Sequence, residues 1–372
     1  MKLLKRLLIT ASVSAFSLIL LSWGWAGHAK INEEAAQSYN QDMIQFNAWT
    51  MMLVAHASDA DYRKDTDPTE APKHYIDIDN YPEFVAIGRI PQTLDSVISI
   101  HGYSFVYDQG ILPWATCIAF DSLKNCFERN DWDKAVLFAA DLGHYVGDGH
   151  MPLHITKNYN GQMTGNNGIH SRYESTMINN HINDILYSGE PVDVIPNVNE
   201  YIFNYLYSNY IYVDSVLAAD DYAKSISGNT NSSDYKEALW NKTKYFTTLL
   251  FKNASHALAE LIYTAWVEAG SPSMLGISDL YHGNELQIHL TQNIPNPFST
   301  STKIDVTISE NCDVTLEIME LSGNIVDILT SQRLSKGNYS FTWNPHQQAG
   351  GIYYLVLSAG KIHEVRKMVL IE

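Results

Sequence analysis

The chain has 372 residues, of which 45% are hydrophobic and 12% aromatic, so it is long enough to bury more than one core and is not disordered. It carries 41 acidic against 24 basic residues, a net charge of −17. Such an acidic surface repels polyanions, which excludes broad electrostatic capture of nucleic acid but not a cation-dependent site for one phosphoester.

Residues 1–22 have the pattern of a secretory signal peptide. They read MKLLKRLLITASVSAFSLILLS, a short basic region followed by an apolar run and a small residue. Cleavage after Ser22 would make Trp23 the first mature residue, although Leu20 is larger than the usual residue three positions before a cut. A cut after Ala26 and an uncleaved membrane anchor are the alternatives. The first cysteine is Cys117, so no lipid anchor is expected at this end.

Residues 23–275 are predicted to form an all-helical domain with long loops. Apolar residues recur there at three-and-four spacing, as on one face of an α-helix. The segments with this pattern are 32–54, 131–147, 170–187, 197–219 and 235–269.

The chain holds only three cysteines. In an oxidising compartment Cys117 and Cys126 would close a small disulfide loop and leave Cys312 over. The alternative is that they are free thiols.

Histidines and acids cluster in five short motifs of the helical domain. In chain order the motifs read WGWAGH, SDADY, HYIDID, GHYVGDGHMPLH and HSRYES. His144 and Asp148 stand four residues apart, as do His170 and Glu174, so each pair shares one face of a helix and can bind one cation. These are nitrogen and oxygen donors without thiolates, the set expected for catalytic rather than structural zinc.

The other candidate donors are expected to differ in their roles. His154 should follow the end of the helix that holds the first pair, since a proline precedes it by two residues. Asp141 and His150 fall on other sides of that helix and are not expected to bind metal. Asp59 is either a second ligand beside Asp61 or a solvated acid.

The order and spacing of these motifs resemble the zinc-dependent phospholipase C and single-strand-specific nuclease superfamily. Its members share an all-helical fold and a cluster of three zinc ions, so the resemblance implies a hydrolase that acts on phosphoric ester bonds. Carried over position by position, the implied zinc ligands are Trp23, His28, Asp61, His74, His144, Asp148, His154, His170 and Glu174.

The resemblance also implies how these residues divide among the three ions. One zinc takes Asp61, His74, His144 and Asp148; a second shares Asp148 and adds His28 with the amino group and carbonyl of Trp23; the third takes His154, His170 and Glu174. Signal-peptide cleavage would then create a ligand. Asp61 is also expected to accept a proton from the water that attacks phosphorus.

Several features favour a phospholipase C-like enzyme. Glu174 stands where the nucleases usually have Asp, and Tyr62 follows Asp61, where an aromatic ring can face a choline ammonium. Ala26 and Ala71, however, occupy the other choline-pocket positions and cannot contribute a ring or a charge.

Other features favour a single-strand-specific nuclease or 3′-nucleotidase. These are the spacing in WGWAGH and the motif HYIDID, in which Tyr75 would stack on a base and Asp77 would hydrogen-bond it. Tyr75 could equally pack against the metal-binding helices. The prediction is a phospholipase C-like hydrolase, with the nuclease and a zinc-bound surface binding protein as alternatives. The substrate partner is thus a phospholipid head group or single-stranded nucleic acid, and no stable protein partner is expected.

The composition changes after residue 275. Residues 276–289 read as a linker, and residues 290–372 alternate in the manner of short strands, which predicts a small antiparallel β-sandwich. The segments NIPNPFSTSTKI, LSGNIV, KGNYSFTWN and GGIYYLVLSAGK resemble the C-terminal sorting domain of type IX secretion substrates. This resemblance implies recognition by the type IX machinery and export through the periplasm across a bacterial outer membrane, to the cell surface or beyond.

Overall fold

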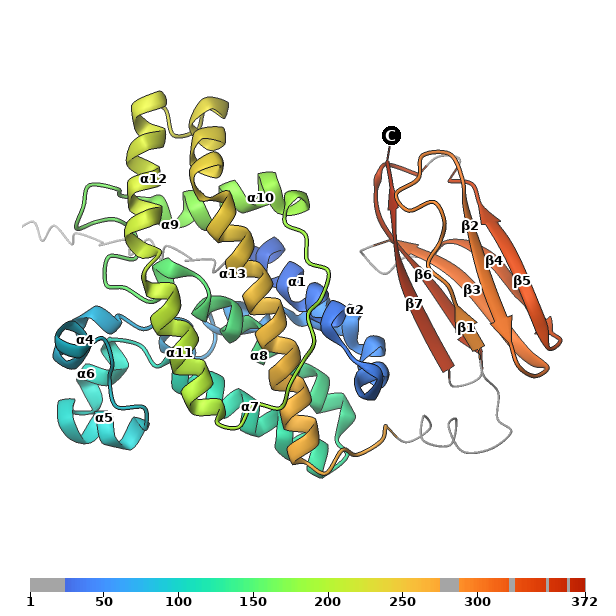
Figure 1. Cartoon of the computed structure of the whole chain (residues 1–372), viewed down its shortest axis with the longest axis horizontal. Coiled ribbons are helices and arrows are strands. Elements are labelled where there is room, and N and C mark those ends of the chain that lie inside the picture. The colour runs from blue at the N-terminus through green and yellow to red at the C-terminus, as the bar shows by residue number, and fades with distance from the viewer. Residues whose placement is uncertain (1–23, 275–287, 321–324, 346–347, 360–361, 372) are drawn as a thin grey trace, which may run out of the picture.

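The computed structural model describes residues 24–274, 288–320, 325–345, 348–359 and 362–371. The signal peptide, Trp23 and nearly all of the predicted linker lie outside these residues. Figure 1 shows a helical domain followed by a β-sandwich, as the sequence predicts. Among the described helices none has both the length and the apolar character needed to cross a bilayer.

The helical domain contains both long and short helices around a buried centre. The α-helices are α1 (Gly24–Glu34), α2 (Thr50–His56), α3 (Asp59–Arg63), α4 (Pro82–Ile87), α5 (Leu94–His101), α6 (Tyr103–Asp108), α7 (Leu112–Glu128), α8 (Trp132–Gly149), α9 (Ile169–Ser171), α10 (Ile178–His181), α11 (Val198–Tyr210), α12 (Val213–Ile226) and α13 (Ser233–Glu268). The 3₁₀ turns are η1 (Ala35–Ser38), η2 (Gln41–Trp49), η3 (Ala71–His74), η4 (Ile78–Asn80), η5 (Pro152–His154) and η7 (Ile182–Asp184), and η6 (Arg172–Met177) is a π-helix.

Two of the predicted helical segments are confirmed nearly to their ends, and the others are broken. α8 and α13 correspond to 131–147 and 235–269. The segment 32–54 is not one helix, because the Asn40 side chain accepts hydrogen bonds from the backbone N–H groups of Asp42 and Met43 and so caps a new turn. The segment 197–219 is divided between α11 and α12, and 170–187 passes through a π-helix and ends its helical turns at Asp184.

The disulfide alternative is wrong, because all three cysteines are free. Cys117 and Cys126 lie on the single helix α7. Nine residues of α-helix rise about 13 Å, far beyond the Cα separation that a disulfide spans.

The sandwich consists of two antiparallel sheets. Their strands are β1 (Ile288–Leu290), β2 (Thr302–Ile308), β3 (Cys312–Glu320), β4 (Ile325–Leu334), β5 (Gly337–Trp343), β6 (Gly351–Ala359) and β7 (Ile362–Leu370). The sheet orders are β1-β2-β5 and β4-β3-β6-β7. Alternate residues of β2 are buried, which is the period-two pattern that the sequence displays. β1 begins two residues before the predicted boundary at 290 and pairs with β2, so it belongs to the sandwich.

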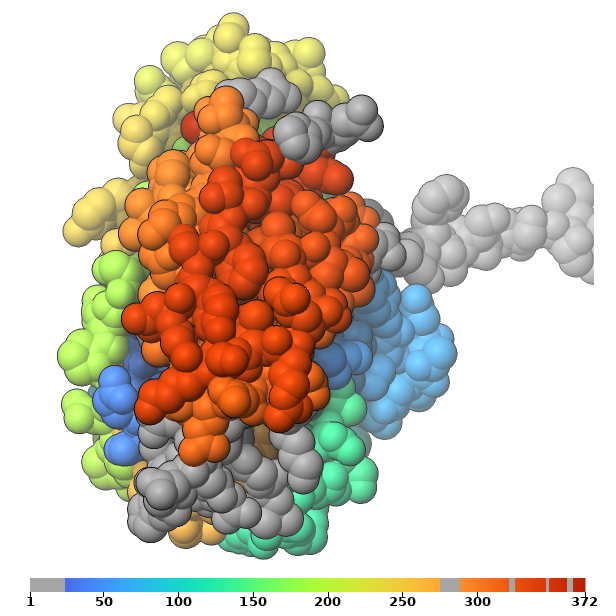
Figure 2. Space-filling view, turned by 90° about the vertical axis from the view of Figure 1, so that its right-hand side faces the viewer, coloured from blue at the N-terminus to red at the C-terminus, as the bar shows by residue number. Residues whose placement is uncertain are grey.

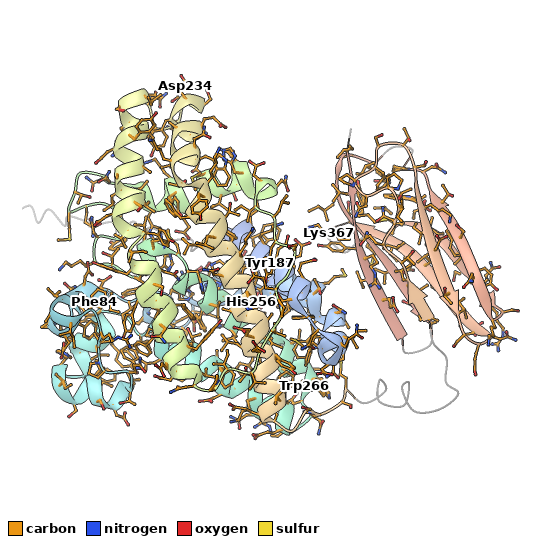
Figure 3. All side chains as sticks on the ribbon, in the orientation of Figure 1. Phe84, Tyr187, Asp234, His256, Trp266 and Lys367 are labelled. Atoms are coloured by element: carbon orange, nitrogen blue, oxygen red, sulfur yellow. The ribbon has the colours of Figure 1, made fainter. Side chains whose placement is uncertain are left out.

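The sandwich contacts the helical domain through β6 and β7. The Lys367 ammonium lies 2.9 Å from Glu33 Oε1 on α1, and the Tyr354 hydroxyl donates to the same oxygen at 3.3 Å. Figure 3 shows Lys367 on the side of the sandwich that faces the helices, and Figure 2 shows the sandwich in front of the helical domain. The sandwich thus contacts α1, the helix that carries His28.

Candidate metal centre

Helix α8 supplies the centre of the candidate site. His144 and Asp148 are fully buried one turn apart, and His144 Nε2 lies 3.4 Å from Asp148 Oδ2. The predicted common face is therefore confirmed. α8 ends at Gly149 and the turn η5 carries His154, also as predicted.

Two glycines of α8 allow α1 to approach closely. A Cβ at Gly147 would lie 2.9 Å from His28 Nδ1, and one at Gly143 would lie 2.4 Å from the Asn32 side chain. With glycine at both positions the His28 ring stacks on His144 at 3.8 Å between centroids. His28 Nε2 then lies 3.6 Å from an Asp148 oxygen.

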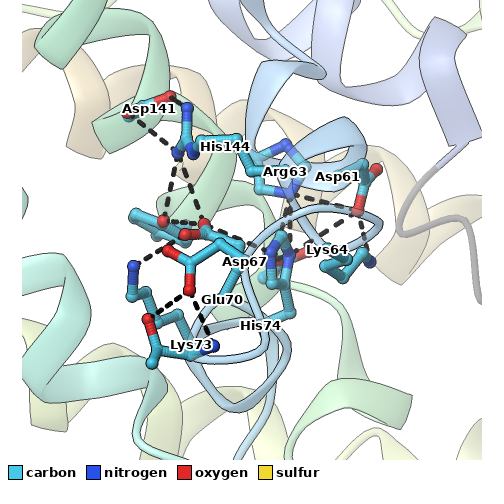
Figure 4. Close-up of polar contacts among 12 residues, drawn as sticks. Asp61, Arg63, Lys64, Asp67, Glu70, Lys73, His74, Asp141 and His144 are labelled. Carbon is cyan, nitrogen blue, oxygen red and sulfur yellow. Dashed lines mark hydrogen bonds and ion pairs between the residues drawn. The ribbon is translucent and has the colours of Figure 1, made fainter.

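Two further candidate ligands reach α8 from upstream. Asp61 lies on α3 and His74 ends the turn η3. His74 Nδ1 lies 3.0 Å from His144 Nε2 and 3.6 Å from Asp61 Oδ1 (Figure 4). It also lies 3.0 Å from Asp148 Oδ2. Residues separated by up to 87 positions in the chain thus converge on one point.

A second cluster lies beside the first. His170 Nε2 is 2.6 Å and His154 Nε2 is 3.8 Å from Glu174 Oε2, and all three side chains are buried. The π-helix η6 follows α9 directly and contains Glu174; single π-turns of this kind occur frequently at functional sites. His154 Nδ1 lies 3.4 Å from Asp148 Oδ1, which joins the two clusters.

The first described residue also touches this cluster. The Gly24 backbone N–H donates to Glu174 Oε1 at 3.4 Å. Trp23, the predicted ligand that precedes it, lies outside the described residues.

Backbone carbonyls orient three of the histidine rings. Nδ1 of His144 donates to Ala57 O at 2.8 Å, Nδ1 of His154 to His74 O at 2.6 Å, and Nδ1 of His170 to Tyr159 O at 3.1 Å. A carbonyl oxygen only accepts, so each Nδ1 carries a proton, and Nε2 is the ring nitrogen left to face the cluster. Metal-binding histidines are held in this way in most metal sites.

The donor set fits metal ions. Three groups of side chains each place candidate ligand atoms within 4.8 Å of one another: His28, His144 and Asp148; Asp61, His74 and His144; His154, His170 and Glu174. The buried atoms His154 Nε2, His170 Nε2 and Glu174 Oε2 make no hydrogen bond of good geometry. Buried nitrogen and oxygen donors of this kind are the usual ligands of zinc.

The electrostatics keep two carboxylates ionised. Burial would raise the pKa of Asp148, but the adjacent His144 and His154 hold that pKa well below its ordinary value. Burial would also raise the pKa of Glu174, but His170 and His154 lower it below its ordinary value. Buried negative charge needs a compensating cation, which a metal ion supplies.

The residues predicted to contact substrate lie around the cluster. Tyr62 follows Asp61 on α3 and its side chain is 61% exposed. The Tyr75 hydroxyl donates to Asp108 O at 3.5 Å. Burial and the neighbouring Asp79 raise the pKa of Asp77 to about 6.

Asp141 and His150, which were not expected to be ligands, and Asp59, which was left open as a ligand or a solvated acid, have other partners. Asp141 lies 3.0 Å from Arg63, and Asp59 lies 2.6 Å from His56. His150 donates to Val146 O and stacks on a tyrosine. None of Asp141, Asp59 and His150 belongs to the three groups of described residues above.

Glu70 is a residue near the site that the motifs did not reveal. Its side chain is 1% exposed and lies 3.6 Å from His74 Nε2. The signal that could have revealed it is its position four residues before His74, the spacing of the two ligand pairs themselves.

Comparisons with known proteins identify one domain of the chain. Residues 293–372 match the family model of the secretion system C-terminal sorting domain, which confirms the predicted sorting domain and indicates export by type IX secretion to the cell surface or outside.

Two solved structures are similar to the chain at low identity. Alpha toxin from Clostridium absonum is 12% identical with a TM-score of 0.42, over 94% of this chain and 95% of that chain. Clostridium perfringens alpha-toxin from an avian strain is 11% identical with a TM-score of 0.42, over 92% and 96%. Comparison with curated proteins finds no match.

Proposed function

We propose that the chain is an exported zinc-dependent phosphodiester hydrolase of the phospholipase C type. The observation that carries this proposal is the convergence of three groups of buried histidines and carboxylates on one centre. When bound, zinc supplies positive charge that polarises a phosphoryl oxygen and makes water more acidic.

Nine residues would hold three zinc ions. Asp61, His74, His144 and Asp148 would hold the first; Asp148, His28 and the amino group and carbonyl of Trp23 the second; His154, His170 and Glu174 the third. The Gly24 contact with Glu174 supports a role for the adjoining residue Trp23. Cleavage after Ser22 would free that amino group, and residues 23–275 would form the catalytic domain.

Asp61 would accept a proton from the attacking water. Its side chain is almost fully buried at the cluster, and its Oδ1 lies 2.5 Å from the Lys64 ammonium. Asp148 and Glu174 would supply the fixed negative charge that holds the cations in place.

The acidic chain and the exposed Tyr62 ring support a phospholipid substrate. A ring that is 61% exposed beside Asp61 is available to a cationic head group, and the net charge of −17 disfavours a polyanion. Replacement of Tyr62 by Ala is expected to raise KM for phosphatidylcholine about fivefold, as loss of about 1 kcal/mol of cation–π attraction requires.

A single-strand-specific nuclease is the second candidate. Tyr75 directly follows His74, Asp77 stands three residues after it, and both are partly exposed, so a base could stack on the ring and bond to the carboxyl group. Protein that begins at Trp23 should be assayed on phosphatidylcholine vesicles and on denatured DNA. If the protein prefers DNA, and if Tyr75→Ala or Asp77→Ala abolishes this preference, the phospholipase proposal is rejected in favour of the nuclease.

The non-enzymatic alternative is a surface protein that binds zinc but does not catalyse hydrolysis. Hydrolysis of bis-p-nitrophenyl phosphate by Asp61→Asn and Asp59→Asn proteins separates the two. We expect chelator-sensitive, zinc-restored turnover that Asp61→Asn abolishes and Asp59→Asn keeps. Absence of zinc-dependent turnover in the wild type would reject the enzyme.

A further inference from the structure

Glu70 is a buried acid that the proposed chemistry does not use. It precedes η3 and belongs to none of the three ligand groups, yet only 1% of its side chain is exposed. An ionised carboxylate in such a place is costly unless hydrogen bonds and cations surround it. The identity of those partners therefore indicates why the charge is there.

The partners of Glu70 come from the same elements as the ligands of the first zinc. Arg63, two residues after Asp61 on α3, lies 3.3 Å from Oε1. Tyr145, which follows His144 on α8, donates its hydroxyl to Oε1, and Lys73 donates to Oε2 at 2.6 Å. Figure 4 shows Glu70 with Arg63, Lys73 and His74 around it. One carboxylate thus connects α3, η3 and α8.

The His74 ring lies between Glu70 and the ligand cluster. Its Nε2 faces Glu70 Oε1 at 3.6 Å, while its Nδ1 faces His144 Nε2 and Asp148 Oδ2 at 3.0 Å each. A cation bound at Nδ1 would require the ring proton to be on Nε2, where the Glu70 carboxylate faces it.

In His74 the ring nitrogen that points away from the cluster faces a carboxylate, and in this it differs from three other histidines of the site. His144, His154 and His170 each donate that N–H to a neutral backbone carbonyl. A carboxylate partner makes an imidazole more basic than a carbonyl partner does, and so makes it a stronger ligand.

We propose that Glu70 is the positioning residue of the first metal site: it orients His74 and strengthens it as a ligand, and it ties the segments that carry Asp61 and His144 together. This inference rests on the zinc binding proposed above. It predicts that loss of the Glu70 charge weakens one metal site and leaves the His154–His170–Glu174 site unchanged.

The test compares Glu70→Gln with Glu83→Gln in protein that begins at Trp23. Glu83 is a matched control, because it also pairs with a histidine ring nitrogen, His101 Nε2 at 3.0 Å, outside the ligand groups. Zinc affinity is measured by competition with a chelator, and the sites are followed by the visible spectrum of the cobalt-substituted proteins. We expect Glu70→Gln to weaken one of three sites about 10- to 100-fold, and Glu83→Gln to weaken none.

Two further variants keep the test decisive if Glu70→Gln does not fold. Tyr145→Phe removes only the hydroxyl that bonds Glu70 and is expected to weaken the same site severalfold, and Glu70→Asp is expected to restore part of the affinity. Equal zinc affinity and equal cobalt spectra for Tyr145→Phe and wild type, or for Glu70→Gln and wild type, would overturn the proposal. A wild-type protein that binds no zinc would instead reject the proposed function.

Discussion

Both domains bury an apolar core, but among the described residues the helical domain alone also buries a cluster of ionisable side chains. The centre of the helical domain holds histidines and carboxylates at zero to a few per cent exposure, among them His28, His144, Asp148 and Glu174. The sandwich has an apolar core that includes Leu316, Leu355 and Trp343. Hydrophobic burial stabilises the sandwich, whereas the helical domain also buries charge that protons or cations must balance. The stability of the helical domain should therefore depend on bound cations and on pH, and that of the sandwich should not.

The largest expected effect comes from the residue that links both clusters. Asp148→Asn keeps the shape of the side chain but removes the charge between His28, His74, His144 and His154. We expect turnover of bis-p-nitrophenyl phosphate to fall on the order of 1000-fold, with at least one zinc lost per chain by elemental analysis. The thermal transition of the sandwich should not move; unchanged turnover would refute the central place of Asp148.

Metal removal should separate the domains. Each zinc ion that binds only the folded helical domain stabilises it by about 4 kcal/mol at a thousandfold excess over Kd, which corresponds to roughly 10 °C in Tm per ion. Calorimetry before and after chelation should show this decrease for one transition and none for the other. A joint shift of both transitions would contradict the comparison.

The reverse experiment acts on the sandwich. Trp343 is 1% exposed and packs edge-on against Phe298 and Tyr353. Trp343→Ala should cost the sandwich about 3–5 kcal/mol. Turnover per folded helical domain should stay at the wild-type value, and a parallel loss of zinc would show that the sandwich supports the metal centre.

The smallest expected effect concerns Asp77 and depends on pH. Burial and Asp79 raise its pKa to about 6, so the native state binds this proton more tightly than the unfolded chain, and stability falls as pH rises from about 4 through 6. In metal-free protein Asp77→Asn should thus be more stable than wild type at pH 7.5 by about 1 kcal/mol, since solvent screens part of the effect, and equal to it near pH 4. Urea unfolding at both pH values measures this; an equal difference at both would exclude the titration of Asp77 as its cause.

Local patterns in the sequence predicted much of the fold. The alternation in β2, β3, β5, β6 and β7 and the periodicity of α8 and α13 are visible in single segments, because one face of each is buried. The pattern did not reveal α7, since apolar side chains occur around most of its circumference, nor the short helices α4, α5 and α6.

The same division holds for the candidate site. Spacing within one helix or turn placed His144 with Asp148 and His170 with Glu174, because residues four apart share a helix face whatever surrounds them. The sequence by itself also determined the donor types, the acidic charge and the order of the domains.

Only the tertiary structure decided how distant segments meet. Gly143 and Gly147 let α1 bring His28 against α8, and a buried carboxylate at Glu70 faces the far side of the His74 ring. No periodicity or residue spacing in the sequence indicates either contact. Both depend on the packing distance between helices and on the need of a buried charge for partners, which are properties of the folded interior.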